Sequence, residues 1–270
     1  MWFYTDKITL CSDVSSAEWY STGLKSSSWE PPSQRPKIAS WVPDVFESYA
    51  RILHPVNDNS TGKTGSPFMT WKSVAEKNGK AVHPLVQFEC IDGIARAPGK
   101  VEPWTDNPRE GTLESEHLHA LMDELAKFTR PEELCWFGLW EGWGGMTPGS
   151  AAYFGRGGAK RMSDEAAATA KLQAQYAAAP RVKTRTRNYI LFSGDLGGAD
   201  AFVETRDNQS MSIWWPDSRS WFVATEVDFR STYVGGSEEF VTAILENPVL
   251  EALRVDASDR VDVQSDTINC

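Results

Sequence analysis

The stretch SIWWPDSRSWFVATEVDFRSTYVGG, Ser212 to Gly236, decides the fold, because it holds the clearest strand pattern and three of the chain's twelve tryptophans. Aromatic and β-branched residues run on both sides of Pro216–Arg219, a composition typical of a β-hairpin with a tight turn. Successive side chains of a strand point to opposite faces, so Trp214 and Trp215 are expected to point apart. Both faces of the hairpin then carry apolar bulk, which predicts a central strand pair covered on two sides.

Helices and strands alternate irregularly on either side of this hairpin. Apolar residues recur with a period of 3.6 over Leu113–Thr129, which predicts a helix. Cap residues predict three more helices, at 70–79 after Thr70, at 164–178 after Ser163, and after Ser237. We expect strands at 49–55, 81–91, 133–143 and 181–192, and short extended pieces at 252–255 and 261–264. Without regular strand–helix–strand units, this order predicts an α+β fold, with a largely antiparallel central sheet and helices packed on it.

The chain is expected to form a single integrated domain over residues 41–270, with an aromatic segment wrapped on it. That segment, residues 1–40, contains Trp2, Trp19 and Trp29, whereas free tails are poor in aromatic residues. Residues 146–180 are rich in glycine and then in alanine, and they form a long insertion between expected strands. Such an insertion is typical of a flexible segment or a lid.

Composition limits the partners of this protein. The 270 residues carry a net charge of −10, which argues against sequence-independent binding to nucleic acid, since that binding depends on neutralising phosphates. No apolar run approaches the ~18–20 residues that span a bilayer, so we expect no membrane partner. The first residues have no basic segment before their apolar ones and no clear cleavage site, and we therefore expect a cytoplasmic protein.

Cysteine and histidine usage predicts neither a metal site nor a cofactor. The four cysteines form no Cys-x-x-Cys pair. Cys90 and Cys135 lie in apolar runs, which is typical of buried thiols, and the terminal Cys270 is expected to be exposed. His117 and His119 are spaced so that they point in different directions from a helix, which makes a poor metal site.

Two groups of residues offer a candidate pocket, although no known catalytic signature is present and the catalytic residues stay unknown. Arg51 and His54 stand at the end of an expected strand, where a histidine can act as a general base. Trp140, Glu141 and Trp143 follow another strand, and tryptophans beside a carboxylate can hold a flat or cationic ligand. A structural role in or above the core is the alternative for both groups.

The quoted hairpin adds five polar candidates for binding. Asp217 and Arg219 belong to its turn, and Glu226, Asp228 and Tyr233 follow it along the chain. The two acidic residues are expected to share a face with apolar side chains, so they need partners if that face is buried.

An alternation of cations suggests an anion-binding ribbon. Arg181, Lys183, Arg185 and Arg187 alternate with uncharged residues, and on a strand all four would share one face. Such a face can meet phosphates or carboxylates. The alternative is a solvated strand whose charges prevent edge-to-edge pairing.

Five stretches carry a family resemblance: YARILHP (49–55), HPLVQF (83–88), CWFGLWEGWG (135–144), NYILFSG (188–194) and WWPDSRSWFVATEVDFRSTYVGGS (214–237). Together they resemble a family of uncharacterised actinobacterial proteins, most specifically in a WWPDxRxWxVATExDxxxTYVGGS block. The resemblance runs from residue 41 to 269 without 146–180, and it implies a single domain and no particular activity. A strand followed by a Ser-led helix, YVGGSEEFVTAIL, is also faintly similar to SUKH-type immunity proteins, α+β domains that bind partners.

These observations favour a non-catalytic binding or protein-interaction protein, immunity-like in role, whose partner is another protein. The lack of a catalytic signature, the acidic character and the many aromatic residues support this interpretation. A small-molecule enzyme, a hydrolase or transferase with a pocket near Arg51, His54, Trp140 and Glu141, is the alternative. A deep pocket that joins His54 to Glu141 would favour the enzyme, and a solid core would favour the binding protein.

Overall fold

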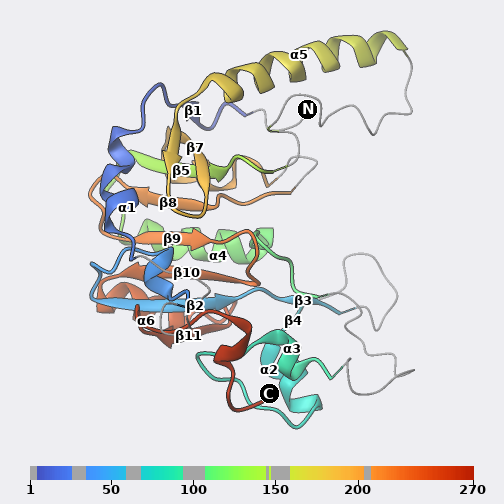
Figure 1. The fold of residues 1–270 in the computed structure, drawn as a ribbon, viewed down its shortest axis with the longest axis vertical. Coiled ribbons are helices and arrows are strands. Elements are labelled where there is room, and N and C mark those ends of the chain that lie inside the picture. Colours follow the sequence, from blue (N-terminus) through green and yellow to red (C-terminus); the bar gives the residue numbers. More distant parts are fainter. Residues whose placement is uncertain are drawn as a thin grey trace.

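The computed structural model describes residues 5–25, 35–58, 68–93, 107–143, 146, 159–203 and 208–270, without the side chains of 159–166. Its centre is a nine-stranded sheet in which every neighbouring pair is antiparallel (Figure 1). The strands follow one another in the order β1 (Thr9–Leu10), β7 (Asn188–Gly194), β5 (Cys135–Trp140), β8 (Ile213–Pro216), β9 (Phe222–Thr225), β10 (Ser231–Gly236), β2 (Ser48–Leu53) and β11 (Ala252–Val255). Strand β6 (Arg181–Lys183) also pairs with β7, and β3 (Val56–Asn57) and β4 (Phe68–Met69) form a separate two-stranded sheet.

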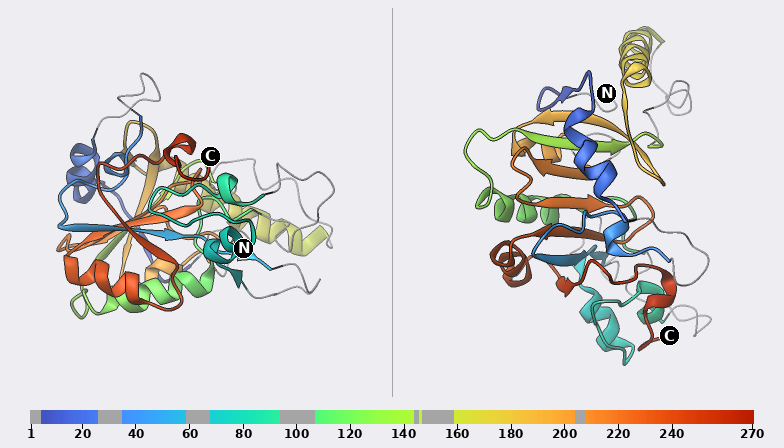
Figure 2. Two further views of the ribbon diagram at one scale, coloured as in Figure 1. Left: turned by 90° about the horizontal axis from the view of Figure 1, so that it is seen from below. Right: turned by 60° about the vertical axis from the view of Figure 1, so that its left-hand side comes forward.

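Helices cover both faces of this sheet, which confirms the predicted α+β class (Figure 2). The described residues form six α-helices: α1 (Glu18–Gly23), α2 (Trp71–Lys77), α3 (Phe88–Ile91), α4 (Ser115–Ala126), α5 (Ala159–Ala178) and α6 (Glu238–Glu246). Helices α4 and α6 pack on one face, and α1 lies on the opposite face. Thr70 caps α2 and Ser237 caps α6, because each hydroxyl accepts a hydrogen bond from a backbone N–H of the first turn, as the sequence predicts.

The stretch Ser212 to Gly236 forms the hairpin β8–β9 and then β10 in the middle of the sheet, and its tryptophans divide between the two core layers. Trp214 lies on the face of α4 and α6, where its ring meets the Trp221 ring edge-on at 5.4 Å. Trp215 lies on the opposite face and stacks on Phe222 at 5.6 Å. All three tryptophans are at most 1% exposed. The predicted central strand pair with apolar bulk on both faces is therefore confirmed.

The turn of this hairpin forms where the sequence predicts it. The Arg219 N–H donates to the Pro216 carbonyl at 2.8 Å, so Pro216 is the first residue of the turn. Arg219 adopts a positive φ of 57°, which is uncommon for a residue that carries a side chain. The last residue of the turn, Arg219, therefore has a left-handed backbone conformation, and the chain then continues into β9.

The predicted strand at 81–91 is wrong, and the piece at 261–264, expected to be extended, is partly helical. Residues 81–91 form a loop and then the short helix α3, because side chains bind the loop's backbone: the Arg51 guanidinium donates to the carbonyls of Pro84 and Val86. Residues 261–264 lead into a 3₁₀ helix, Val263–Ser265, that the Asp262 carboxylate caps by accepting from the Gln264 N–H. In both segments polar side chains take the hydrogen bonds that a strand neighbour would have supplied.

Helix α5 occupies the second half of the predicted insertion. It begins at Ala159, five residues before the predicted start, and residues 144–145 and 147–158 lie outside the described residues. No helix in the described part of the chain is both long and apolar enough to cross a membrane.

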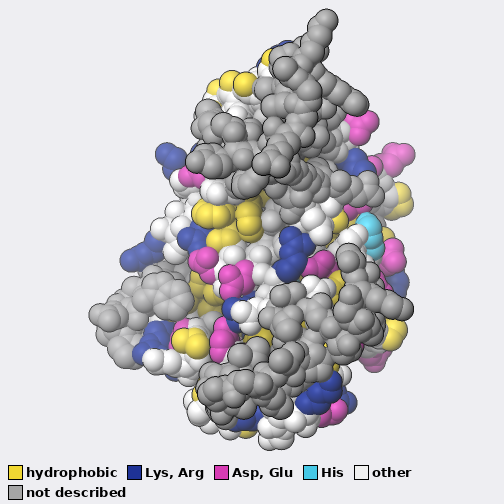
Figure 3. Space-filling view, turned by 90° about the vertical axis from the view of Figure 1, so that its right-hand side faces the viewer, with side chains coloured by type: hydrophobic (Ala, Val, Ile, Leu, Met, Phe, Trp, Pro, Cys, Tyr) yellow, Lys and Arg dark blue, Asp and Glu magenta, His cyan; other side chains and the backbone are white. Residues whose placement is uncertain are grey.

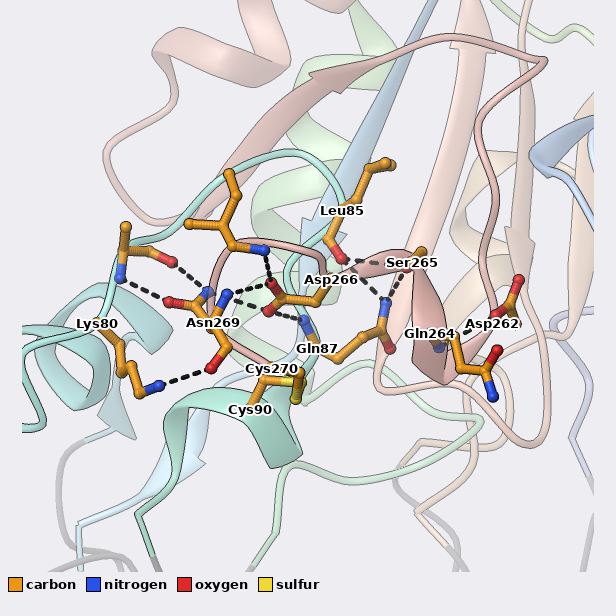
Figure 4. The surroundings of a disulfide bond; sticks show 12 residues. Lys80, Leu85, Gln87, Cys90, Asp262, Gln264, Ser265, Asp266, Asn269 and Cys270 are labelled. Carbon is orange, nitrogen blue, oxygen red and sulfur yellow. Dashed lines mark hydrogen bonds between the residues drawn. A yellow bond between two sulfur atoms is a disulfide. The ribbon is translucent and has the colours of Figure 1, made fainter.

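A disulfide joins Cys90 in α3 to the terminal Cys270, which corrects the expectation of two separate thiols (Figure 4). The two cysteines are 180 residues apart in sequence, and their Cα atoms are 5.3 Å apart. Asp266 holds the same segment in place, since its carboxylate accepts from the backbone N–H groups of Gln87 and Asn269. These hydrogen bonds help to keep the pKa of Asp266 at about 2. Cys135 is a buried free thiol, as predicted.

Candidate functional site

Polar and aromatic candidate residues meet at one end of the sheet, where β5 and β9 end and β7 and β10 begin. We call this group the strand-end cluster; it consists of Trp140, Glu141, Arg181, Arg187, Glu226 and Asp228. Figure 3 looks onto this end of the molecule and shows acidic and basic side chains next to hydrophobic ones. The hairpin brings Glu226 and Asp228 to the cluster, and the chain that enters β7 brings Arg187.

Arg187 is the centre of the cluster. Its Nη2 lies 2.6 Å from Glu226 Oε1, and its Nε donates to the same oxygen at 2.8 Å. The same guanidinium pairs with Asp228 and lies over the Trp140 ring, with Cζ 5.5 Å from the ring centroid. Two carboxylates thus share a single cation, which leaves a charge of −1 on the group.

The two carboxylates differ in their access to water. Glu226 is 4% exposed, and burial raises its pKa although the Arg187 guanidinium opposes that shift. The Asp228 side chain is 74% exposed. Asp228 is therefore the carboxylate of this pair that an incoming group can reach.

A second cation beside the cluster is also shared by two carboxylates. Arg230 pairs with Glu89 and, at 3.0 Å, with Glu110. Both acidic side chains are about half exposed, at 51% and 52%, whereas the Arg230 side chain is 16% exposed. Arg230 with its two carboxylates forms a triad with a net charge of −1. It lies next to the first triad, which Arg187 forms with Glu226 and Asp228.

A cavity of about 340 Å³ lies between the two triads, and a smaller one of about 60 Å³ adjoins it. We call the two together the acidic cleft; its walls include Trp41, Glu89, Arg187, Glu226, Asp228 and Phe229. The Trp41 ring meets the Phe229 ring edge-on at 4.8 Å, so the cleft has aromatic as well as acidic walls. The buried Trp41 indole N–H helps to lower the pKa of Glu226, yet it makes no hydrogen bond of ordinary geometry with any described residue.

Within the cluster, Glu141 is held in a fixed position, and Trp143 lies beside the cluster. Glu141 accepts hydrogen bonds from Asn188 Nδ2 at 2.6 Å and from Arg181 Nε at 2.8 Å. The Asn188 hydrogen bond and then Arg181 lower the pKa of Glu141. The Trp143 ring meets the Trp140 ring edge-on at 5.7 Å. The Glu141 carboxylate therefore holds Asn188 and Arg181 in position and is already hydrogen-bonded, so it is not free to bind a ligand.

The predicted four-cation ribbon does not form, and that prediction is wrong. Strand β6 ends at Lys183, and a turn closed by the Thr184 N–H on the Arg187 carbonyl at 2.9 Å reverses the chain. Arg181 therefore lies in β6 and Arg187 lies just before β7, and each is paired with a carboxylate. Arg185 lies within the turn, so the four side chains share no common strand face.

Arg51, His54 and Tyr233 are buried inside the fold, at 5%, 0% and 4% exposure. Arg51 and Tyr233 are cross-strand partners, and the guanidinium lies 6.0 Å from the Tyr233 ring. Arg51 and Tyr233 line the smaller cavity of the acidic cleft. None of the four principal cavities in the described part of the chain is lined by His54 or by Glu141. The pocket that would join these two residues is therefore not among those cavities.

His54 is held as a neutral imidazole. Its Nδ1 lies 2.7 Å from the Arg109 carbonyl, which only accepts, so Nδ1 carries the proton and Nε2 accepts from the Thr232 hydroxyl at 2.9 Å. Burial lowers the pKa of His54 to about 4. These contacts give His54 a structural role between β2 and β10.

We expect the buried His54 to make the protein sensitive to acid. The unfolded chain takes up a proton near pH 6.5 that the folded chain takes up only near pH 4, so the free energy of unfolding falls across that interval, by roughly 3 kcal/mol in total. Urea denaturation of wild type and His54→Gln from pH 8 to pH 4 measures this. The variant should lose the steeper slope below pH 6.5, and His119→Gln, at an exposed histidine, should keep it. Equal slopes in all three proteins would contradict the assignment.

Asp217 and Arg219 lie at the opposite end of the sheet, in the turn between β8 and β9. Asp217 accepts a hydrogen bond from the Trp136 indole N–H at 3.2 Å. The Arg219 guanidinium lies over the Trp19 ring, with Cζ 5.1 Å from the centroid. These two candidates therefore belong to no common site with the strand-end cluster.

The sequence analysis does not single out several residues of the acidic cleft and its second triad, among them Trp41, Glu89, Glu110, Phe229 and Arg230. Phe229 and Arg230 stand inside the quoted hairpin, beside the predicted Asp228, and their position in the chain was a usable signal. Trp41 and Glu110 come from loops and Glu89 comes from α3, all distant in the chain, and nothing in their local sequence distinguishes them.

Comparison with protein-family models, with curated proteins and with solved structures finds no match to this chain.

Proposed function

We propose that this protein is a non-catalytic binding protein whose acidic cleft receives a cationic side chain of a partner protein. The observation that carries the proposal is the pair of adjacent triads, Arg187 with Glu226 and Asp228, and Arg230 with Glu89 and Glu110. Each triad has one cation for two carboxylates, and three of the four carboxylates are at least half exposed. A guanidinium or ammonium group placed between them would neutralise this excess.

The walls of the cleft suit such a group. Trp41 and Phe229 offer aromatic surface, which attracts a cation held over the ring. The chain's net charge of −10 would also speed the approach of a basic partner. The immunity-like role that the sequence resemblance implies needs such a surface, because an immunity protein acts by binding its partner.

The proposal predicts selective binding of a cationic probe. We expect hexa-arginine to bind the wild-type protein in isothermal titration calorimetry, and hexa-glutamate not to bind. Asp228→Asn and Glu89→Gln should each raise the Kd for hexa-arginine roughly tenfold, because each removes an exposed carboxylate of one triad.

Matched controls separate the cleft from the general acidity of the protein. Asp123→Asn in α4 and Glu246→Gln in α6 remove the same charge from exposed positions away from the cleft. They should change the Kd by less than twofold. If the controls weaken binding as much as the cleft variants do, net charge rather than the cleft is responsible and the proposal fails.

A small-molecule enzyme remains the second candidate function. None of the principal cavities in the described part of the chain joins the residues proposed for its pocket, Arg51, His54, Trp140 and Glu141. The cytoplasmic location also stays a prediction. The Cys90–Cys270 disulfide weighs against it, because disulfides persist chiefly in oxidising compartments.

A further inference from the structure

A second, larger cavity lies at the β11 edge of the sheet and is separate from the acidic cleft. It has a volume of about 1220 Å³, and we call it the edge groove. Its lining includes Tyr49, Leu85, Glu238, Arg254, Val255 and Ile268. None of these residues belongs to the strand-end cluster or the acidic cleft, so the edge groove needs its own explanation.

The groove lies beside the end of the last strand of the sheet: Arg254 and Val255 of β11 line it, and residues 256–259 continue its wall. β11 pairs with β2 on one side and has no strand on the other within the described residues. The Leu53 N–H donates to the Glu251 carbonyl at 2.9 Å, which makes this a hydrogen-bonded pair of the antiparallel ladder. Such pairs alternate along the ladder, so Leu253 and Val255 also face β2 with their backbone groups. The backbone N–H and C=O groups of Ala252 and Arg254 therefore point outward.

These outward groups are available to a partner. No other described segment of the chain makes a backbone hydrogen bond to Ala252 or Arg254 from the outer side. An unpaired sheet edge is a template for one further strand, since only another backbone supplies donors and acceptors at the matching spacing.

The side chains beside the edge differ on the two faces of β11. On one face the groove is bordered by Val255, Leu85 and Ile268, and Ile268 is 64% exposed although it is apolar. On the other face Arg254 makes a two-pronged ion pair with Glu238. Because strand side chains alternate between faces, a segment added here would meet apolar and charged surroundings in turn.

We propose that the edge groove binds an extended segment of a partner polypeptide, which joins the sheet as a strand next to β11. The segment carries alternating apolar and polar side chains, with the apolar ones toward Leu85 and Ile268. It runs antiparallel to β11, the orientation that gives the more stable ladder. A second copy of this chain is a poorer occupant, because each copy carries a net charge of −10 and the copies repel one another.

The test starts from a displayed library of linear 12-residue peptides selected against the full chain, with the best binder made synthetically. Arg254→Pro removes the outward N–H but no hydrogen bond to β2, and proline is tolerated at such edge positions. Arg254→Ala is the matched control, which removes the side chain and keeps the N–H. Both variants lose the Arg254 side chain, so only the N–H distinguishes them, and we expect the Kd in Arg254→Pro to be at least tenfold higher than in Arg254→Ala.

Two further measurements keep the proposal testable if the proline variant folds poorly. The bound peptide should slow hydrogen exchange of the Arg254 amide at least tenfold in the wild-type protein. N-methylation of alternate peptide residues should weaken binding, and N-methylation of the residues between them should not. The proposal is overturned if no selected peptide protects the Arg254 amide, if proline and alanine variants bind alike, or if sedimentation shows a dimer that Arg254→Pro abolishes.

Discussion

Replacing Cys270 by serine is expected to lower the free energy of unfolding by about 5 kcal/mol, the largest effect of any single change considered for this protein. The disulfide to Cys90 closes a loop of 180 residues, and a cross-link over so long a loop removes much conformational entropy from the unfolded chain. This loss of stability should exceed the loss from removing any single hydrogen bond nearby. The hydrogen bonds of Asp266 would still hold the terminal segment in the variant, so the effect comes from the missing cross-link.

Urea denaturation with and without a reductant measures this effect. Wild type in reductant should be as unstable as Cys270→Ser, and reductant should not change the variant. Cys11→Ser, at a half-buried free thiol, should leave stability nearly unchanged. Thiol titration of the denatured, unreduced wild type should find two free cysteines, Cys11 and Cys135. Four free thiols, or a Cys270→Ser variant as stable as oxidised wild type, would contradict the disulfide.

Trp214→Ala is expected to destabilise the protein by about 4 kcal/mol, because it removes one of the largest fully buried side chains from the middle of the sheet. The substitution leaves a cavity beside Trp221 and Phe137, whose rings lie 5.4 Å and 6.3 Å from the Trp214 ring. Strands β5, β8 and β9 cannot move together to fill it, since their backbones are hydrogen-bonded in register.

Trp136→Ala is the matched control for this prediction. Trp136 pairs with Trp215 across β5 and β8, but its side chain is half-buried, so its loss should cost roughly 1 kcal/mol. Thermal and urea denaturation of both variants give the comparison. Equal losses in the two variants would mean that the hairpin does not form the centre of the core.

The features that the sequence predicts correctly are those set by short-range patterns. The hairpin turn at Pro216, the caps Thr70 and Ser237, and the amphipathic helix α4 depend on residues within a few positions of one another. Loop 84–87 illustrates the opposite case. Its apolar residues fit a strand pattern. However, Arg51 and Asp266, which are distant in sequence, form hydrogen bonds with its backbone groups.

Sequence patterns predict only part of the candidate site, because the rest of it depends on contacts between residues that are distant in the chain. Glu226 and Asp228 stand out in the sequence because charged residues follow an apolar strand and need partners. The alternation of cations places their partner Arg187 in a cation ribbon instead, since nothing in that alternation indicates the four-residue turn that begins at Thr184. Pairing of Cys90 with Cys270 could not be deduced, because spacing alone does not determine which cysteines meet.

The acidic cleft can be tested directly through the indole N–H signals of the twelve tryptophans in a ¹⁵N-correlated NMR spectrum. As hexa-arginine is added, we predict shifts of the Trp41 and Trp140 signals, because Trp41 lines the cleft and Trp140 stacks on Arg187. The core signals of Trp214, Trp215 and Trp221 should not move. Shifts that spare Trp41, or that persist unchanged in Asp228→Asn, would contradict a cation-binding role for the cleft.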